Sequence, residues 1–70
     1  MHRIIHDREL DRFLCPDGSW SAEWRAARNF DDTATLLDVA MHLPQPKLEE
    51  VVIFGQVPSP YDVKLPLYHF

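Results

Sequence analysis

The sequence predicts an α+β fold with the element order ββαβ(β), in which a small antiparallel sheet packs on one main α-helix and ends in an extended C-terminal arm. Three observations support this. Two short apolar runs flank a polar loop near the start of the chain, which is typical of a β-hairpin. A capped amphipathic segment, 31–43, predicts the helix. A β-branched and aromatic run, 50–54, predicts a third strand.

The hairpin is expected over residues 4–15. Symmetric closure of its four-residue loop, 8–11, pairs His6 with Phe13 and Asp7 with Arg12. The second pair is expected to be an exposed ion pair. Successive side chains of a strand point to opposite faces. The two faces are therefore expected to carry Ile5 and Leu14 on one side, and Ile4, His6, Phe13 and Cys15 on the other.

Turn and cap residues organise the middle of the chain. Pro16-Asp17-Gly18 predicts a turn, and Ser21 is expected to cap a short helix over residues 22–28. Asp31 or Asp32 is expected to cap the main helix, where a negative charge favours the positive end. Pro44 and Pro46 are expected to end it. The buried stripe of the main helix is predicted to be Leu36, Leu37, Ala40, Met41 and Leu43.

Residues 1–56 are expected to form the hairpin–helix–strand unit, and residues 57–70 a proline-containing arm of the same domain. Glu49 and Glu50 are interpreted as the solvated start of the third strand. In the arm, apolar side chains alternate with polar residues or proline from Tyr61 to Leu67, which predicts a fourth extended segment. A proline in that segment cannot donate to a ladder, so the segment belongs at a sheet edge or on another surface. The pattern leaves open whether the arm folds back or binds in trans.

Length and cysteine content limit how the fold is stabilised. A chain of 70 residues forms one domain and buries only about 60% of the surface that its unfolded form exposes. Cys15 is the single cysteine, so the sequence offers neither an intrachain disulfide nor a zinc-ligand spacing. We therefore expect a partner or self-association to add stability. The lack of a long apolar run and of a signal-like N-terminus predicts a cytoplasmic protein.

The charge distribution argues against nucleic-acid binding. The net charge is −4, and neither half of the chain has the basic excess that phosphate binding needs. A stacking and phosphate-binding surface for single-stranded nucleic acid could be formed by Trp20 and Trp24 with Arg12, Arg25 and Arg28. The alternative, which we favour, places Trp20 in the core and lets arginine stems cover Trp24.

A pattern in the first half of the chain gives a resemblance to known domains. Asp17-Gly18-Ser19-Trp20-Ser21 is followed by Ala27-Arg28-Asn29-Phe30 and then by the capped helix. This resembles a class of small bacterial and phage domains of unassigned activity, in which a D-G-x-W-[ST] turn precedes an A-[RK]-x-F segment. The resemblance covers roughly residues 3–54 and implies the fold but no catalytic residues. Trp24 departs from the small or proline residue usual at its position.

No residue pattern predicts catalysis, a metal or a cofactor. His2 and His6 lie about 13 Å apart on a strand, too far to share an ion, and His42 suits a helix C-terminus. A Cys15–His6 nucleophile pair would lie on a face that looks like core. Adjacent acids such as Asp31-Asp32 are typical helix caps. With two glycines in the chain, a phosphate-binding loop is excluded.

The apolar residues on both faces of the expected sheet predict a contact surface. One helix covers one face, so the arm or another polypeptide must cover the second face. The sequence therefore predicts a non-enzymatic interaction module. It would be a homodimer that associates through a sheet face or the C-terminal arm, or an accessory subunit of a larger assembly. The expected contact residues are Ile5, Leu14, Trp24, Tyr61, Leu65, Leu67, Tyr68 and Phe70.

An alternative function is that of an acidic inhibitor from a phage or mobile element. Such a protein would occupy the basic groove of a nucleic-acid enzyme through a surface of carboxylates. The residues that would carry it are Asp31, Asp32, Asp38, Glu49, Glu50 and Asp62.

Overall fold

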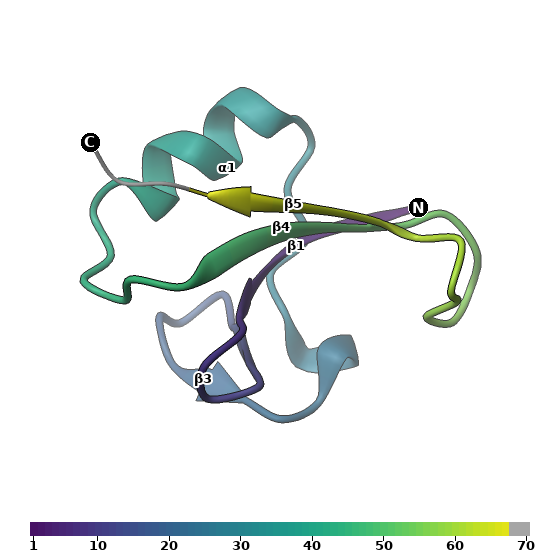
Figure 1. Ribbon diagram of the computed structural model, residues 1–70, viewed down its shortest axis with the longest axis horizontal. Helices are drawn as coiled ribbons and strands as arrows, with labels where there is room; N and C mark the ends of the chain where they lie inside the picture. The colour runs from purple at the N-terminus through teal and green to yellow at the C-terminus, as the bar shows by residue number, and fades with distance from the viewer. Residues whose placement is uncertain (68–70) are drawn as a thin grey trace.

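The computed structural model describes residues 1–67. These residues form a five-stranded antiparallel sheet and one α-helix, which confirms the predicted α+β class (Figure 1). The order across the sheet is β3-β2-β1-β4-β5, which puts the two six-residue strands, β1 and β4, side by side. The strands are β1 (His2–Asp7), β2 (Arg12–Leu14), β3 (Trp20–Ser21), β4 (Leu48–Ile53) and β5 (Val63–Leu67).

The β1–β2 hairpin has the predicted register, with His6 opposite Phe13 and Asp7 opposite Arg12. The prediction of an ion pair between Asp7 and Arg12 is wrong. The carboxylate of Asp7 instead accepts the backbone N–H groups of Glu9 and Leu10, at 2.9 and 3.3 Å. These bonds close the hairpin turn and leave Asp7 only 2% exposed. A local turn bond therefore takes the carboxylate away from the cross-strand partner.

The turn after β2 leads into a short strand, β3, that the sequence did not predict. Gly18 has φ +87°, a conformation that favours glycine. The Ser19 hydroxyl and backbone N–H both donate to Asp17, and these bonds lower the pKa of that carboxyl. The turn brings Trp20–Ser21 back beside β2, with Leu14 opposite Trp20.

The short helix predicted over 22–28 is a single 3-10 turn, η1 (Trp24–Ala26). The Ser21 hydroxyl accepts the Glu23 N–H at 3.1 Å, but the chain becomes extended again at Ala27. Two backbone bonds to the sheet follow, from Arg28 N–H to the Leu14 carbonyl and from Phe30 N–H to the Arg3 carbonyl. Contact with the sheet therefore replaces the bonds that a longer helix would make.

The main helix, α1 (Thr33–Ala40), begins as predicted at Asp32, which accepts the Thr35 N–H at 2.7 Å. Its buried stripe is narrower than expected. Leu36 and Ala40 are buried, whereas Leu37 and Met41 are 39% and 73% exposed. A single short helix presents one ridge to the sheet, so the neighbouring ridge stays in solvent.

Two hydrophobic clusters lie on opposite faces of the sheet. The cluster beneath α1 contains Ile5, Leu14, Phe30, Leu36, Ala40 and Leu48. The cluster on the other face contains Ile4, Val51 and Ile53, with Phe13, Trp24 and Ala27 packed against it. Figure 1 shows α1 on one side of the sheet and the segment with η1 on the other. The expectation that the arm or another polypeptide must cover the second face is therefore wrong in large part, because the connector that carries Trp24 and Ala27 packs on that face.

The arm folds back onto its own chain. β5 pairs with β4 along its whole length, with Glu50 opposite Leu65 and Val52 opposite Val63. The predicted extended edge segment is thereby confirmed, and the arm pairs with the sheet of its own chain. The interpretation of Glu49 and Glu50 as solvated is wrong, since they are 7% and 1% exposed. β4 starts at Leu48 rather than Glu50. Side chains packed on the two faces of β4 bury the carboxylates, His6 beside Glu49 and Arg3 with Thr33 beside Glu50.

Candidate functional site

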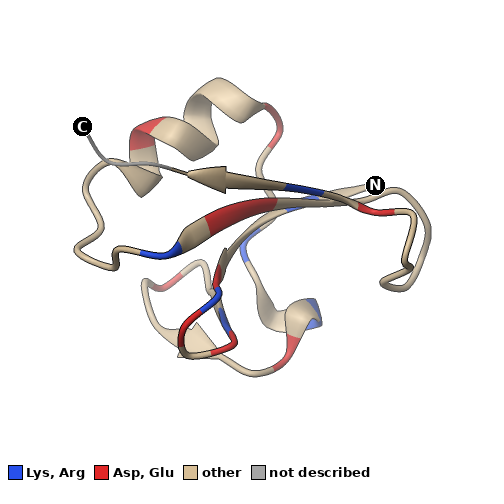
Figure 2. Cartoon of the chain, viewed as in Figure 1, with Lys and Arg blue, Asp and Glu red and all other residues tan. Residues whose placement is uncertain are grey.

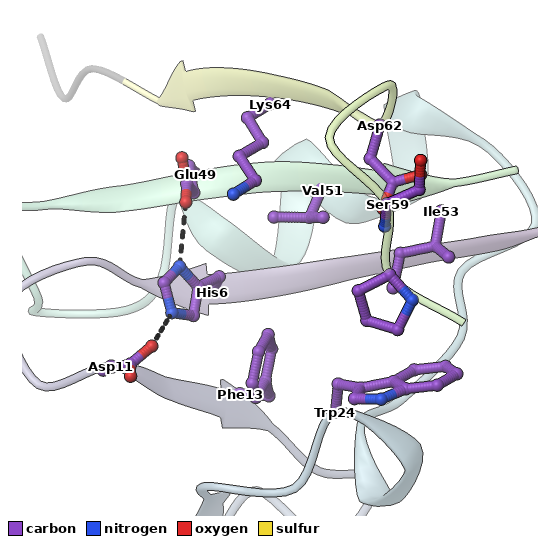
Figure 3. Close-up of a pocket in the computed structure, with 11 residues that line it drawn as sticks. His6, Asp11, Phe13, Trp24, Glu49, Val51, Ile53, Ser59, Asp62 and Lys64 are labelled. Atoms are coloured by element: carbon purple, nitrogen blue, oxygen red, sulfur yellow. Dashed lines mark hydrogen bonds and ion pairs between the residues drawn. The ribbon is translucent and has the colours of Figure 1, made fainter.

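A cavity of about 150 Å³ opens on the face of the sheet opposite α1 (Figure 3). Its floor is apolar, formed by Val51 and Ile53 of β4. Phe13 and Trp24 form an aromatic wall. Pro58, from the loop before β5, also lines the cavity. The polar residues around this apolar interior are His6, Asp11, Glu49, Ser59, Asp62 and Lys64. We call this cavity the sheet pocket.

Strand register brings the pocket residues together. His6 lies opposite Phe13 on one side and opposite Glu49 on the other. Directly paired residues share a face, so these side chains and that of Lys64, which is opposite Val51, gather on one surface. Trp24 reaches the same surface from η1 and meets the His2 ring edge-on at 5.3 Å.

The loop that supplies the far rim of the pocket is fixed by its own hydrogen bonds. Ser59 N–H donates to the Asp62 carboxylate at 2.7 Å, and Asp62 N–H donates to the Ser59 carbonyl at 3.1 Å. Tyr61 N–H donates to the Ser59 hydroxyl at 3.1 Å. This compact turn holds Ser59 and Asp62 at the pocket and turns Tyr61 outward, with 89% of it exposed.

His6 lies between two carboxylates. Its Nδ1 is 2.8 Å from Oε1 of Glu49, and its Nε2 is 2.8 Å from Oδ1 of Asp11 (Figure 3). Both ring nitrogens are therefore already in contact with an acidic side chain. Cys15 is buried and the imidazole is already engaged, so the structure forms no Cys15–His6 nucleophile pair.

The same geometry does not form a metal site. The imidazole separates Glu49 from Asp11, so the three groups lie in a row around the ring instead of converging on one point. Within residues 1–67, no group of three or more histidine, cysteine or acidic side chains is placed to hold a metal ion.

Glu50 forms a second buried network on the helix side of the sheet. The Thr33 hydroxyl donates to its Oε2 at 2.8 Å, and Nε of Arg3 lies 3.2 Å from the same oxygen. That Arg3 N–H is not aimed well enough to count as a hydrogen bond, so the contact is an ion pair only. Arg3 Nη1 donates to the Asp31 carbonyl at 2.8 Å. These contacts join β1 and β4 to the start of α1.

The structure separates the predicted contact residues into three groups. Ile5 and Leu14 are 0% and 4% exposed beneath α1, so they do not face a partner. Leu67 packs against the same cluster. Trp24 forms a wall of the sheet pocket, while Tyr61 and Leu65 are 89% and 49% exposed. Tyr68 and Phe70 lie outside the described residues.

Sequence reasoning named Glu49 and Asp62 only as acids of an inhibitor surface, and it missed that Glu49, Lys64 and the 58–62 loop line one pocket. The sequence of β4 held a signal for the burial of the glutamates, because Leu48 and Val51 on either side of them are apolar. Two adjacent strand residues within such a run point to opposite faces. If both faces are covered, both carboxylates become buried.

The structure leaves less exposed surface for the acidic-inhibitor function and for nucleic-acid binding than the sequence suggested. Burial of Glu49 and Glu50 removes two of the six carboxylates of the acidic-inhibitor hypothesis. Trp20 packs against the helix-side cluster, and Arg25 lies over the Trp24 ring at 4.7 Å. Figure 2 shows acidic and basic residues alternating around the β1–β2 hairpin instead of forming a basic face.

Comparison of the chain with protein families, with curated proteins and with solved structures finds no match. In the part of the chain that the structure describes, no helix is long and apolar enough to cross a membrane.

Proposed function

We propose that this protein is a non-enzymatic interaction module that self-associates through its C-terminal arm. The observation that carries this proposal is the exposure of the arm. Although the arm pairs with β4, Tyr61, Val63 and Leu65 remain 89%, 39% and 49% exposed. Grouped apolar side chains at the surface of a small domain mark a contact site.

The neighbouring helix ridge extends this apolar region. The Thr33 hydroxyl donates to Glu50 of β4, so this side of α1 faces β4. Leu37 and Met41 follow Thr33 at four-residue intervals on the same ridge and are also exposed. We define the arm surface as Leu37, Met41, Tyr61, Val63 and Leu65.

A second copy of the chain is the partner that these features support. The hydrophobic clusters on the two faces hold six and three buried residues, and the chain contains one cysteine. A domain of this size with no disulfide gains most from burying surface in an oligomer. A two-fold pairing of the arm surface would be self-complementary and closed.

The pairing would use side chains more than backbone. Pro66 interrupts the row of N–H donors along β5, which is a usual feature of edge strands that resist the addition of another strand. The exposed apolar side chains beside that edge are unaffected by the missing N–H.

Sedimentation equilibrium over a wide range of protein concentration tests the proposal. The wild-type chain should form a dimer, and Leu65→Glu should be monomeric with an unchanged circular dichroism spectrum. Leu10→Glu is the matched control, because Leu10 is 64% exposed in the hairpin turn, separated from β5 by β1 and β4. A wild-type monomer at every concentration, or a Leu65→Glu dimer as tight as wild type, would show that the arm does not mediate self-association.

A further inference from the structure

We propose that the sheet pocket of each chain receives the Tyr61 side chain of a second copy, in a reciprocal exchange. The inference rests on the proposed self-association and names the contact that would carry it. Its starting point is an unusual juxtaposition. A large aromatic side chain, 89% exposed, sits on the loop whose Pro58, Ser59 and Asp62 line an apolar pocket.

The size and lining of the pocket match a phenol ring. A cavity of about 150 Å³ is large enough for one benzene-sized group. Phe13 and Trp24 provide an aromatic wall, and Val51 and Ile53 an apolar floor (Figure 3). Aromatic rings pack edge-to-face or offset against such walls. The lining therefore favours an aromatic occupant over a charged one.

The polar rim matches the hydroxyl of tyrosine. A buried tyrosine needs a partner for its O–H group. The carboxylates of Glu49 and Asp62 can accept a proton donor at the pocket, and the Lys64 side chain points toward it (Figure 3). Oε1 of Glu49 and Oδ2 of Asp62 already accept hydrogen bonds from His6 and Ser59. Each of these carboxylates has a second oxygen.

The loop presents Tyr61 in a fixed direction. Its backbone N–H is bound to the Ser59 hydroxyl, and Ser59 and Asp62 are bonded to each other twice. A preformed turn lowers the entropy that is lost when its side chain enters a partner. The same turn directs Tyr61 into solvent rather than into the pocket of its own chain.

Because Tyr61 lies close to the pocket of its own chain, the exchange should give a closed dimer rather than an open chain of copies. When the inserting residue and its receptor lie at one place on the surface, a two-fold axis through that place forms both contacts together. Two copies then satisfy each other, and no receptor remains for a third. The side chains of Val63 and Leu65 point to the α1 face of the sheet, because Lys64 between them lines the pocket, so the pocket contact does not include them.

Substitution of Tyr61 gives the first test, with the dimer dissociation constant measured by sedimentation equilibrium. Tyr61→Ala should weaken the dimer about tenfold or more, as truncation of an aromatic hot spot does. Tyr61→Phe keeps the ring and should weaken it less. Val57→Ala is the control, because Val57 is 54% exposed in the same connection but does not line the pocket.

Mixed dimers give the second test, because the exchange is reciprocal. Lys64→Trp should fill the pocket with its own ring and leave Tyr61 intact, while Tyr61→Ala leaves the pocket intact. Each variant alone should dimerise poorly. A mixture of the two should form heterodimers that retain one native contact, at a level above either homodimer. In an isotope-filtered NMR experiment on the wild-type dimer, the Tyr61 ring of one chain should show contacts to Phe13 and Trp24 of the other.

The outcomes separate the two proposals. If Tyr61→Ala dimerises as tightly as wild type while Leu65→Glu is monomeric, the pocket contact is wrong and self-association through the arm stands. The absence of heterodimers above the homodimer level, or of the intermolecular contacts, likewise overturns the pocket contact. A wild-type monomer at all concentrations overturns both.

Discussion

At the scale of single residues, the main feature is a pair of buried glutamates that point to opposite faces of β4. Glu49 joins His6 at the sheet pocket, and Glu50 joins Arg3 and Thr33 beneath α1. A buried carboxylate is tolerated where opposite charges and hydrogen-bond donors surround it. The chain supplies these partners from segments remote in sequence, so loss of one partner leaves a charge without compensation.

Removal of Arg3 should therefore be costly. Arg3→Met leaves the Glu50 carboxylate buried, 1% exposed, without its cation, and we expect the free energy of unfolding to fall by about 3 kcal/mol. Adding Glu50→Gln removes the charge but keeps an acceptor for the Thr33 hydroxyl. The double variant should recover a large part of the loss in urea denaturation. If Arg3→Met and the double variant were equally stable, the charge of Glu50 without Arg3 would not be the cause of the loss.

The helix cap should make stability depend on acid pH. The Thr35 backbone N–H, and then its side chain, lower the pKa of Asp32 below the usual 3.8. Its stabilising contribution is therefore complete above that value and is lost as the pH falls through the lower pKa of the folded state. Asp32→Asn keeps an oxygen acceptor but not the charge. The difference in melting temperature between wild type and Asp32→Asn should shrink below pH 4, and a difference independent of pH would contradict this.

At the scale of secondary-structure elements, α1 and β5 each divide into a buried and an exposed side. Leu36 and Ala40 are covered by the sheet, whereas Leu37 and Met41 remain exposed. β5 is held to β4 along its length but exposes Val63 and Leu65. The exposed sides of these two elements form the arm surface.

Two leucines on adjacent positions of α1 should therefore differ in their contribution to stability. Leu36→Ala leaves a cavity in a site that is 0% exposed and should lower the free energy of unfolding by about 3 kcal/mol. Leu37→Ala, at a position 39% exposed, should lower it by less than about 1 kcal/mol. Both are measured in urea at a protein concentration low enough to keep the chain monomeric. Equal losses would contradict the narrow stripe.

At the scale of the whole molecule, net charge opposes the apolar contacts proposed for the dimer. Each chain carries a net charge of −4, so two copies repel each other at long range. Around the β1–β2 hairpin acidic and basic residues alternate (Figure 2), so this region does not offer a strongly basic surface to an acidic one.

Added salt should therefore tighten self-association. Screening over about 10 Å at 0.1 M ionic strength reduces the repulsion, while burial of apolar side chains is little affected. The dimer dissociation constant should fall by a few fold between low and moderate salt in sedimentation equilibrium. A dimer that weakens steeply with salt would show instead that ion pairs hold it together.

The candidate site was predictable in part. The hairpin register placed His6 and Phe13 on a common face, and the sequence offers Trp24 as a second large ring four residues after Trp20. Glu49, Lys64 and the 58–62 loop were not predictable as neighbours of these residues. Their contacts with His6, Phe13 and Trp24 arise from pairing of β1 with β4 and of β4 with β5, which a local pattern does not specify.

The sequence by itself determined the features that depend on residues close together in the chain. Examples are the hairpin register, the Asp32 cap, the order of the main elements and the extended form of the arm. Tertiary structure alone decided which side chains are covered. Glu49 is buried because it meets His6 across 43 residues of chain, and Glu50 because Thr33 and Arg3 enclose it. Burial depends on what packs from elsewhere, whereas turns, caps and alternation follow from backbone sterics and local hydrogen bonds.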